Sequence, residues 1–293
     1  MPQAGIRRDS TGQILFVAVI INFPTQRKIA AILSAYDDLI ENNQRRIALL
    51  EKMAEEIYHE WFVRLRFPGY QTAEFEKGIP KGWKEKPIRE IFDYLEGPGI
   101  RNWQYTDSGF PFINIRLIQN GDIHVKNASF ISENEATGKY SHFQLKEGDY
   151  VVSTSGTLGR GAIVQSYHLP LLLNTSVIRF RTKDCMSQSF MYEYLKSDLF
   201  VRQIETFATG AAQQNFGPMH LKLMKMIVPT QEILKKFEKI SGSIFQQIRV
   251  FRESNQNLVK TKEMLLPRLI SGKLSVADLN IQFPPSMLED EAA

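Results

Sequence analysis

Apolar residues recur at alternating intervals of four and three over residues 24–67. Such a heptad seam predicts a long helix with coiled-coil packing. At about 1.5 Å per residue, residues 26–65 would form a rod of roughly 60 Å. Asn43 is the polar member of the seam, as expected for a residue that fixes register and partner number. Ala54 also falls on the seam. The predicted pairing positions are Ile29, Leu33, Tyr36, Ile40, Asn43, Ile47, Leu50, Ile57 and Trp61.

A second helical pattern covers residues 229–272 and is less regular. It contains a four-four step at Ile240, Ile244 and Ile248, and Lys262 interrupts the stripe. Pro267 is expected to kink or end the helix, with Gly272 as a C-terminal stop. The predicted pairing positions are Phe237, Ile240, Ile244, Ile248, Phe251, Asn255, Leu258 and Leu265.

Both helices open with Pro-Thr-Gln, and each opening follows a strand-like apolar run. Thr25 and Thr230 are candidate N-caps, and Pro24 should prevent an earlier helix start. The run "ILFVAVII" at 14–21 is strongly β-branched and far shorter than the ~20 residues of a membrane helix. We therefore predict a buried strand there.

Residues 78–228 have a different texture, in which short apolar runs alternate with Gly, Asn, Asp and Ser. Runs such as "FPFINI" at 110–115 and "TSVIRFRT" at 175–182 predict strands, and residues 187–208 predict one helical interlude. The fold class is α+β: one mixed α/β domain flanked by two long coiled-coil helices. The acidic stretch 273–293 is expected to be a flexible tail.

Composition narrows the chemistry only a little. The apolar fraction of 43% is that of a globular protein, and 36 Lys and Arg against 32 Asp and Glu mildly favour polyanionic partners. The lone Cys185 excludes an internal disulfide framework and fits a reducing compartment. With five scattered histidines and one thiol, a structural zinc site is not expected.

Catalytic motifs are absent from the sequence. "SGTLGRG" lacks the Gly-Lys-Ser/Thr ending of a P-loop, and "EGPGIRN" lacks the third glycine of a dinucleotide fingerprint. "FPPS" at 283–286 lacks the Asn or Asp and the aromatic residue of an adenine methyltransferase motif. The five histidines show no nucleophile or carboxylate pairing. We predict a non-catalytic chain with no cofactor of its own.

The order of five segments resembles the specificity subunit of type I restriction-modification systems. These segments are "IPKGWKEKPIREIF" at 79–92, "VVSTSGTLGRGAIV" at 151–164, "LLLNTSVIRFR" at 171–181, "QQNFGPMHLKLMKMIVPTQE" at 213–232 and "LLPRLISGKL" at 265–274. The resemblance implies a target-recognition domain at 78–228 between two spacer helices. It also implies double-stranded DNA as ligand, in a prokaryotic cytoplasm with no membrane partner.

Chemistry would belong to partner subunits in this family. The resemblance implies a DNA adenine methyltransferase subunit that binds S-adenosylmethionine. A restriction subunit using ATP with Mg²⁺ is a further possible partner. The family's typical layout has two recognition domains, whereas one complete copy is present here. Residues 1–23 then read as the exit strand of a missing first domain. The chain would be either a half-length subunit acting as a homodimer or a truncated one.

Candidate DNA contacts lie in turn-like segments of the central domain. Arg and Lys neutralise phosphates, whereas Asn, Gln and Arg can read base edges in bidentate fashion. Lys139 is a further cation that a DNA groove could reach. Trp103 and Tyr105 are expected to pack on the domain. Arg179 and Arg181 share one strand face that could be solvated. Loop amides are as often ordinary turn residues. The predicted DNA contacts are Arg101, Asn102, Arg116, Lys126, Ser153, Ser155, Thr157, Arg160, Gln213, Gln214 and Asn215.

Two other functions fit the same pattern. A coiled-coil adaptor whose central domain binds protein would show no salt-dependent DNA affinity. A stand-alone dimeric DNA-binding regulator would bind DNA without a methyltransferase partner. Co-purification with a methyltransferase separates this regulator from the specificity subunit.

Overall fold

The computed structural model describes residues 6–8, 14–16, 21–156, 159–183, 186–207, 216–283 and 287. The chain divides into two compact units. We call residues 1–51 with 247–293 the helix-pair unit, and residues 52–246 the sheet unit. The two long helices each contribute to both units.

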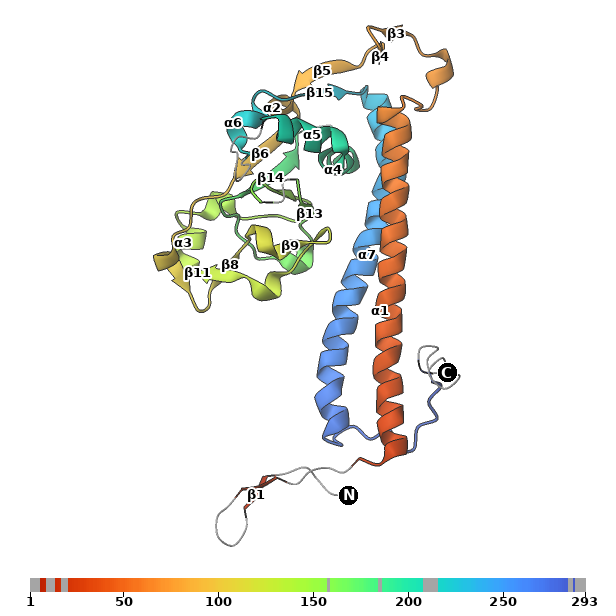
Figure 1. Ribbon diagram of the computed structural model, residues 1–293, viewed down its shortest axis with the longest axis vertical. Helices are drawn as coiled ribbons and strands as arrows, with labels where there is room; N and C mark the ends of the chain where they lie inside the picture. The colour runs from red at the N-terminus through yellow and green to blue at the C-terminus, as the bar shows by residue number, and fades with distance from the viewer. Residues whose placement is uncertain are drawn as a thin grey trace. The chain divides into compact units, whose positions relative to one another are not determined.

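Two long helices, α1 (Phe23–Tyr58) and α7 (Gln231–Ile270), confirm the predicted flanking helices. In the helix-pair unit they lie side by side (Figure 1). Thr25 is not the cap of α1, because the helix begins at Phe23 and Asn22 Oδ1 accepts a hydrogen bond from the Thr25 backbone N–H at 3.0 Å. Pro24 is tolerated since the first turn of a helix leaves its N–H groups without intrahelical partners.

The seam of α7 is more regular than its apolar residues suggest. Ile240 is 42% exposed, whereas Ser241 is completely buried. The prediction that Ile240 is a pairing residue is therefore wrong. With Ser241 in the seam and Lys262 retained, the positions from 237 to 269 alternate four and three without a break. The four-four step in the apolar pattern arises because Ser241 is polar, although its side chain is buried in the seam.

The C-terminal end of α7 is followed by packed chain rather than a free tail. Pro267 lies inside α7, which ends at Ile270, and Gly272 follows with φ +70°. Val276 is 2% exposed and packs with Ile29 and Leu269. Val276 and Ile281 therefore hold part of the segment 273–283, predicted to be flexible, against α1 and α7 within the helix-pair unit. The same segment receives Lys28 Nζ at the Ala277 carbonyl oxygen, 2.5 Å away, and its Phe283 ring lies 4.8 Å from the Arg27 guanidinium.

The N-terminal part contains a short antiparallel pair, β1 (Ile6–Arg8) and β2 (Ile14–Phe16). The strand expected over 14–23 is described only for β2. Residues 21 and 22 are not in a strand, and Phe23 already belongs to α1. Residues 17–20 lie outside the described part of the chain.

The sheet unit is built on a four-stranded antiparallel sheet in the order β13-β12-β14-β6. Its strands are β6 (Phe92–Glu96), β12 (Tyr150–Ser153), β13 (Gly161–Ile163) and β14 (Val177–Thr182). A three-stranded sheet in the order β7-β11-β8 consists of β7 (Tyr105–Thr106), β8 (Phe110–Phe112) and β11 (Ser129–Ile131). The pattern of short strands and breaks confirms the α+β prediction.

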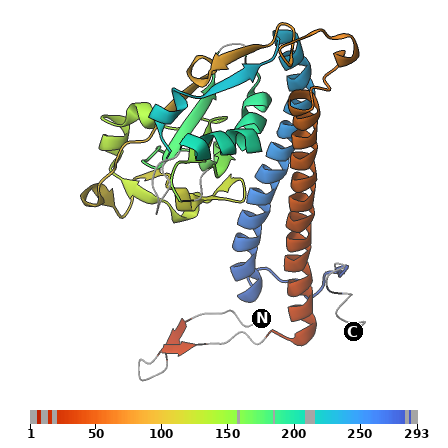
Figure 2. The same ribbon diagram turned by 45° about the horizontal axis from the view of Figure 1, so that its top comes forward.

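Smaller strand pairs complete the sheet unit. They are β3 (Phe75–Glu76) with β4 (Ile79–Pro80), and β9 (Ile118–Gln119) with β10 (Asp122–Ile123). Strand β5 (Lys84–Pro87) pairs with β15 (Lys225–Val228), so the entrance and exit of the predicted domain lie together. Figure 2 shows this last pair as neighbouring orange and blue arrows.

Helices of the sheet unit are short. They are α2 (Ile88–Ile91), α3 (Glu133–Thr137), α4 (Gln188–Lys196), α5 (Asp198–Phe207) and α6 (Pro218–Leu221). The single helical interlude expected at 187–208 is two helices, because Ser197 adopts an extended conformation between them. Its hydroxyl donates to the Tyr194 carbonyl at 2.6 Å and accepts from the Phe200 N–H at 3.3 Å.

An aromatic cluster joins the ends of both long helices to the core of the sheet unit. After α1 a five-residue π-helix, η1 (His59–Val63), carries Trp61 and Phe62. The Phe62 ring lies 4.9 Å from Phe237 of α7 and 4.8 Å from Phe190 of α4, both edge-on. Trp61 also meets Phe237, at 5.7 Å. These contacts explain why the helix ends belong to the sheet unit.

A polar junction lies beside this cluster. The Glu238 carboxylate of α7 accepts hydrogen bonds from the Ser189 backbone N–H at 3.0 Å, from Ser189 Oγ at 3.1 Å and from Ser187 Oγ. Ser187 in turn caps α4 by accepting from the Phe190 N–H. A negative charge at the N-terminus of α4 is also favoured by the helix dipole. The junction therefore fixes α4 against the first turns of α7.

Candidate nucleic-acid interface

The turn after β12 is shaped by glycines and closed by a serine. Gly156 and Gly159 have φ of +71° and +74°, conformations that side chains with a Cβ rarely adopt. Ser153 is 1% exposed, and its Oγ accepts a hydrogen bond from the Arg160 N–H at 3.1 Å. Ser155 is 7% exposed. Both serines are therefore buried in the turn, contrary to the prediction that Ser153 and Ser155 contact DNA. Thr157 lies outside the described residues.

Three predicted cations come from adjacent elements, and we call Arg116, Lys126 and Arg160 the basic group. Arg160, at the start of β13, donates through Nη1 to the Ile118 carbonyl of β9 at 3.3 Å. Arg116 lies two residues before Ile118, in the 3₁₀ turn η4 (Ile115–Leu117).

Lys126 lies beyond the paired strand β10, in the 3₁₀ turn η5 (Val125–Asn127). All three side chains of the basic group are exposed. They could neutralise phosphates of one bound segment.

Local hydrogen bonds hold these turns in place. Asn114 accepts the Arg116 backbone N–H at 2.9 Å and so caps η4. Gln119 Nε2 donates to the Arg116 carbonyl at 2.7 Å. The side chain of Ile115 lies 3.7 Å from the position that a Cβ on Gly156 would take. The basic group therefore sits on a fixed backbone beside the glycine turn.

Arg101 and Asn102 lie in a different segment, residues 97–105, which we call the aromatic loop. Both are exposed, and Asn102 opens the 3₁₀ turn η3 (Asn102–Gln104). Trp103 is 81% exposed, so the expectation that it packs on the domain is wrong. Tyr105 is 42% exposed, with its ring edge-on to Phe112 at 5.1 Å. Arg101 and Asn102 thus lie in a different segment from the turns that carry the basic group.

Two other arginines form ion pairs with aspartates inside the domain. Arg179 is buried and donates to Asp93 at 2.7 Å. Arg181 binds Asp149 through two nitrogens, one of them at 2.8 Å, and this hydrogen-bonded carboxylate raises the pKa of Arg181. The face they share is therefore not a solvated one, and they stabilise the sheet rather than an anion.

The predicted adenine readers Gln213, Gln214 and Asn215 lie outside the described residues. The next residue, Phe216, is buried, and its N–H donates to the Thr154 carbonyl at 2.9 Å. The chain that follows these three residues is therefore anchored beside the glycine turn.

The structure describes a polar triad around a buried histidine near β10. The Gln165 N–H donates to His168 Nδ1 at 3.0 Å, so Nε2 carries the proton of the neutral ring and faces Asp122 Oδ1 at 3.0 Å. His168 is 2% exposed, and we assign it a role in packing. Within the described ranges no group of three or more His, Cys, Asp or Glu side chains could hold a metal ion, and no helix is long and apolar enough to cross a membrane.

Most of the predicted pairing residues belong to the helix-pair unit, where α1 and α7 lie against each other, whereas Ile57, Trp61, Phe237 and Ile244 belong to the sheet unit. Asn43 Nδ2 donates to Asn255 Oδ1 at 2.9 Å. Lys262, which seemed to interrupt the stripe, donates to Asp37 at 2.6 Å. The seam therefore contains polar pairs as well as apolar contacts. The predicted residues that are buried or half-buried are Ile29, Leu33, Tyr36, Ile40, Asn43, Ile47, Leu50, Ile57, Trp61, Phe237, Ile244, Ile248, Phe251, Asn255, Leu258 and Leu265.

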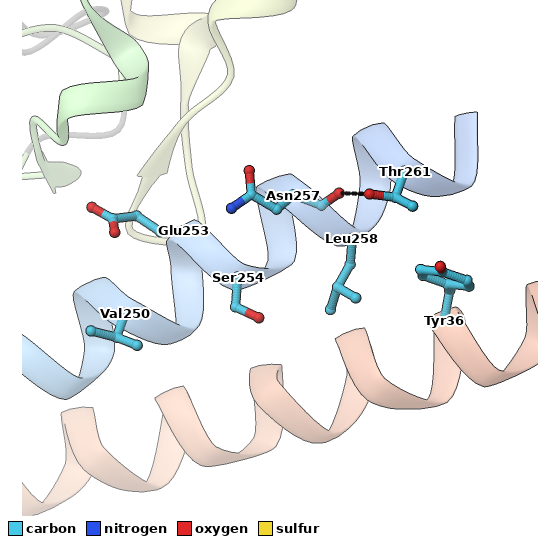
Figure 3. A pocket seen from close by; sticks show the side chains of 7 residues that line it. All are labelled: Tyr36, Val250, Glu253, Ser254, Asn257, Leu258 and Thr261. Atoms are coloured by element: carbon cyan, nitrogen blue, oxygen red, sulfur yellow. Dashed lines mark hydrogen bonds between the residues drawn. The ribbon is translucent and has the colours of Figure 1, made fainter. Parts of the chain in front are cut away.

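A shallow groove runs along the same helix pair. Figure 3 shows Tyr36 of α1 and Leu258 of α7 facing each other between the helices. The remaining lining comes from α7, where the Thr261 hydroxyl donates to the Asn257 carbonyl at 2.8 Å. The groove is lined by Tyr36, Val250, Glu253, Ser254, Asn257, Leu258 and Thr261.

Comparison with known proteins identifies a family with this arrangement of domain and helices. Residues 80–258 match the family model described as type I restriction modification DNA specificity domain. The chain belongs to this family. The predicted resemblance to type I specificity subunits is confirmed, and the matched range contains the whole four-stranded sheet, the basic group and the aromatic loop.

Relatives of the family share the sequence at moderate identity. The chain is 26% identical over 264 residues to the type I restriction enzyme MjaIX specificity subunit of Methanocaldococcus jannaschii, covering 87% of this chain and 60% of that protein. It is 23% identical to the HindI specificity subunit of Haemophilus influenzae, covering 92% and 72%. The crystal structure of a type I S subunit from M. genitalium has a TM-score of 0.53 at 18% identity, covering 85% of this chain and 61% of that one. The chain thus spans about three fifths of the first relative's length, and the solved structure supports the fold.

Proposed function

We propose that this chain selects the DNA sequence on which a type I restriction-modification complex acts. The observation that carries the proposal is the match of residues 80–258 to a DNA specificity domain. The exposed basic group, held on capped turns, supports it, because phosphate contacts position such a domain on a duplex. The chain supplies recognition and leaves methyl transfer and cleavage to other subunits.

The central domain reads one half-site of a split target in this proposal. Arg116, Lys126 and Arg160 anchor phosphates, while Arg101 and Asn102 approach base edges from the aromatic loop. Gln213, Gln214 and Asn215 remain proposed adenine readers, and Thr157 a proposed phosphate contact. Two copies of the chain acting as a homodimer would supply both half-sites, and the paired helices would set the distance between them. Closed two-fold pairing is the commonest solution for two identical readers.

The helix pair is also the proposed docking surface for a DNA adenine methyltransferase subunit that binds S-adenosylmethionine. Leu49 of α1 is 64% exposed, and Val250 and Met264 of α7 are 51% and 64% exposed. Exposed apolar side chains on the two helices suit an amphipathic helix of a partner, and Val250 also lines the groove. A restriction subunit using ATP with Mg²⁺ would join the same assembly, which would work in the prokaryotic cytoplasm.

Methylome sequencing tests the proposal. Cells that make the chain together with its methyltransferase should carry methylated adenines in one split motif, and cells lacking the chain should lose methylation of that motif entirely.

A binding measurement tests the basic group. The doubly substituted Arg116→Ala/Arg160→Ala chain should bind the motif more weakly and with a smaller salt dependence. Each lost phosphate contact should lower the slope of log K against log salt by roughly one. Lys236→Ala is the matched control, because Lys236 is half exposed and pairs with Glu232 on α7. An unchanged methylome without the chain would refute the proposed function.

A further inference from the structure

The aromatic loop is anchored at both ends. At its start, a Cβ on Gly97 would lie 2.3 Å from the Asn174 backbone, so only glycine fits there. The Gly97 N–H donates to the Val177 carbonyl at 3.3 Å. The Ile100 N–H donates to Asn174 Oδ1, also at 3.3 Å, and the Ile100 side chain is buried in the small core around Phe112. The first half of the loop is therefore fixed to the chain that precedes β14.

The second half is anchored through one buried amide. Gln104 is 6% exposed, and its Oε1 accepts the Arg101 N–H at 3.0 Å, which closes the 3₁₀ turn. Its Nε2 donates to Glu135 Oε1 at 2.7 Å and to the Tyr140 hydroxyl at 3.1 Å. Both partners belong to α3 and the residues after it. The turn is therefore held rigidly on the domain.

Trp103 lies between these anchors and is 81% exposed. The other two tryptophans, Trp61 and Trp83, are 8% and 6% exposed. A large apolar ring kept in water on a rigid turn contributes nothing to the core, and exposed aromatic residues with this support are typical of contact surfaces. Because the turn is already ordered, little conformational entropy would be lost on binding.

The charged groups around Trp103 favour an anionic partner. Arg101 and Asn102 precede it directly and are exposed. Lys139 lies over the Tyr140 ring at 5.0 Å, next to the anchor of Gln104. The Glu135 carboxylate is half-buried and hydrogen-bonded to Gln104 and Ser132.

We propose that Trp103 is a DNA-contact residue whose indole packs on bases or sugars of the half-site, with Gln104 as its positioning residue. This inference rests on the proposed function, since it names a further residue of the same recognition surface. Side chains that pack on bases carry a large share of the affinity of the proteins that use them, and they tolerate another aromatic ring better than alanine.

The test is hydroxyl-radical footprinting of the full chain in complex with its methyltransferase subunit. The complex is measured with and without a duplex that carries the motif identified by methylome sequencing. Oxidation of Trp103 should fall strongly when the duplex is added. Trp103→Ala should weaken binding of that duplex roughly 5- to 150-fold, with an unchanged melting temperature. Trp103→Phe should recover most of the affinity. Phe75→Ala, at a 48% exposed aromatic of β3, is the matched control and should bind as the wild type.

Two results would overturn the inference while leaving the proposed function intact. Trp103 could stay fully oxidised in a complex that binds the duplex, or the methyltransferase subunit alone could protect it before any DNA is added. The second result would make the aromatic loop a protein contact. Failure of the whole complex to distinguish the motif duplex from a scrambled one would refute both proposals together.

Discussion

Asn43 of α1 and Asn255 of α7 form a side-chain hydrogen bond of 2.9 Å inside the helix pair. Asn43 is 4% exposed, so its amide is removed from water and depends on this partner. A buried amide pair costs free energy in every register except the one that aligns the two residues. The relationship therefore specifies how α1 and α7 align in the helix-pair unit.

Replacing Asn43 by Leu should lower the free energy of unfolding by about 1–2 kcal/mol, because Asn255 Oδ1 loses the donor of this hydrogen bond in a half-buried site. Asn42→Leu, at an exposed position one residue earlier, should change it by less than about 0.5 kcal/mol. The double variant Asn43→Leu/Asn255→Leu should recover stability and populate additional oligomers. Urea denaturation and sedimentation velocity measure both effects. A single oligomeric state in the double variant would show that the pair does not set partner number.

The corrected seam of α7 predicts opposite sensitivities for two neighbouring isoleucines. Ile244→Ala should cost about 2–4 kcal/mol of unfolding free energy, because Ile244 is 6% exposed. Ile240→Ala should cost less than about 1 kcal/mol, since Ile240 is 42% exposed. Equal losses in urea denaturation would restore the four-four seam read from the sequence.

The junction between α4 and α7 should depend on the Glu238 carboxylate. Glu238→Ala removes the acceptor of three hydrogen bonds and should destabilise the sheet unit by about 1–3 kcal/mol. Glu232→Ala, which breaks an exposed pair with Lys236 on the same helix, should leave the melting temperature close to that of the wild type. Thermal denaturation measures both effects, and the Glu238 variant should melt at the lower temperature. Similar melting temperatures for the two variants would argue against a fixed junction.

The C-terminal segment 273–283 should stabilise the end of the helix pair. Val276→Ala should lower unfolding free energy by about 1–2 kcal/mol, because Val276 is 2% exposed between Ile29 and Leu269. Leu279→Ala is the control, as Leu279 is 52% exposed. The Val276 variant should also be cleaved faster by protease after α7. Equal cleavage rates for the Val276 and Leu279 variants would mean that burial of Val276 does not hold the segment against the helices.

The sequence was most informative where periodicity and burial agree. The four-three spacing of α1 and the short strands of the sheet unit predict these elements because one face of each must be apolar. Ser241 shows the limit of that argument, since a polar but small side chain can be completely buried. Val276 shows another, because an isolated valine in a polar stretch gives no periodic signal.

The candidate interface was less predictable from sequence. Composition identifies Arg116 and Arg160 as possible phosphate contacts, but it cannot separate them from Arg179, which the fold pairs with Asp93. The sequence predicts that Trp103 packs on the domain, whereas the structure exposes its ring. The available signal was Gln104, an amide placed three residues after Arg101 that can close a turn and hold the intervening ring outward.

Insertion of one heptad into both α1 and α7, beside the Asn43–Asn255 pair, tests the central claim that this chain chooses the DNA address through a ruler of paired helices. Seven residues add roughly 10 Å of helix and preserve the seam. Methylome sequencing of cells carrying the extended chain should show the same read bases separated by about three more base pairs, at 3.4 Å each. An unaltered gap, or methylation that no longer depends on the chain, would contradict the account.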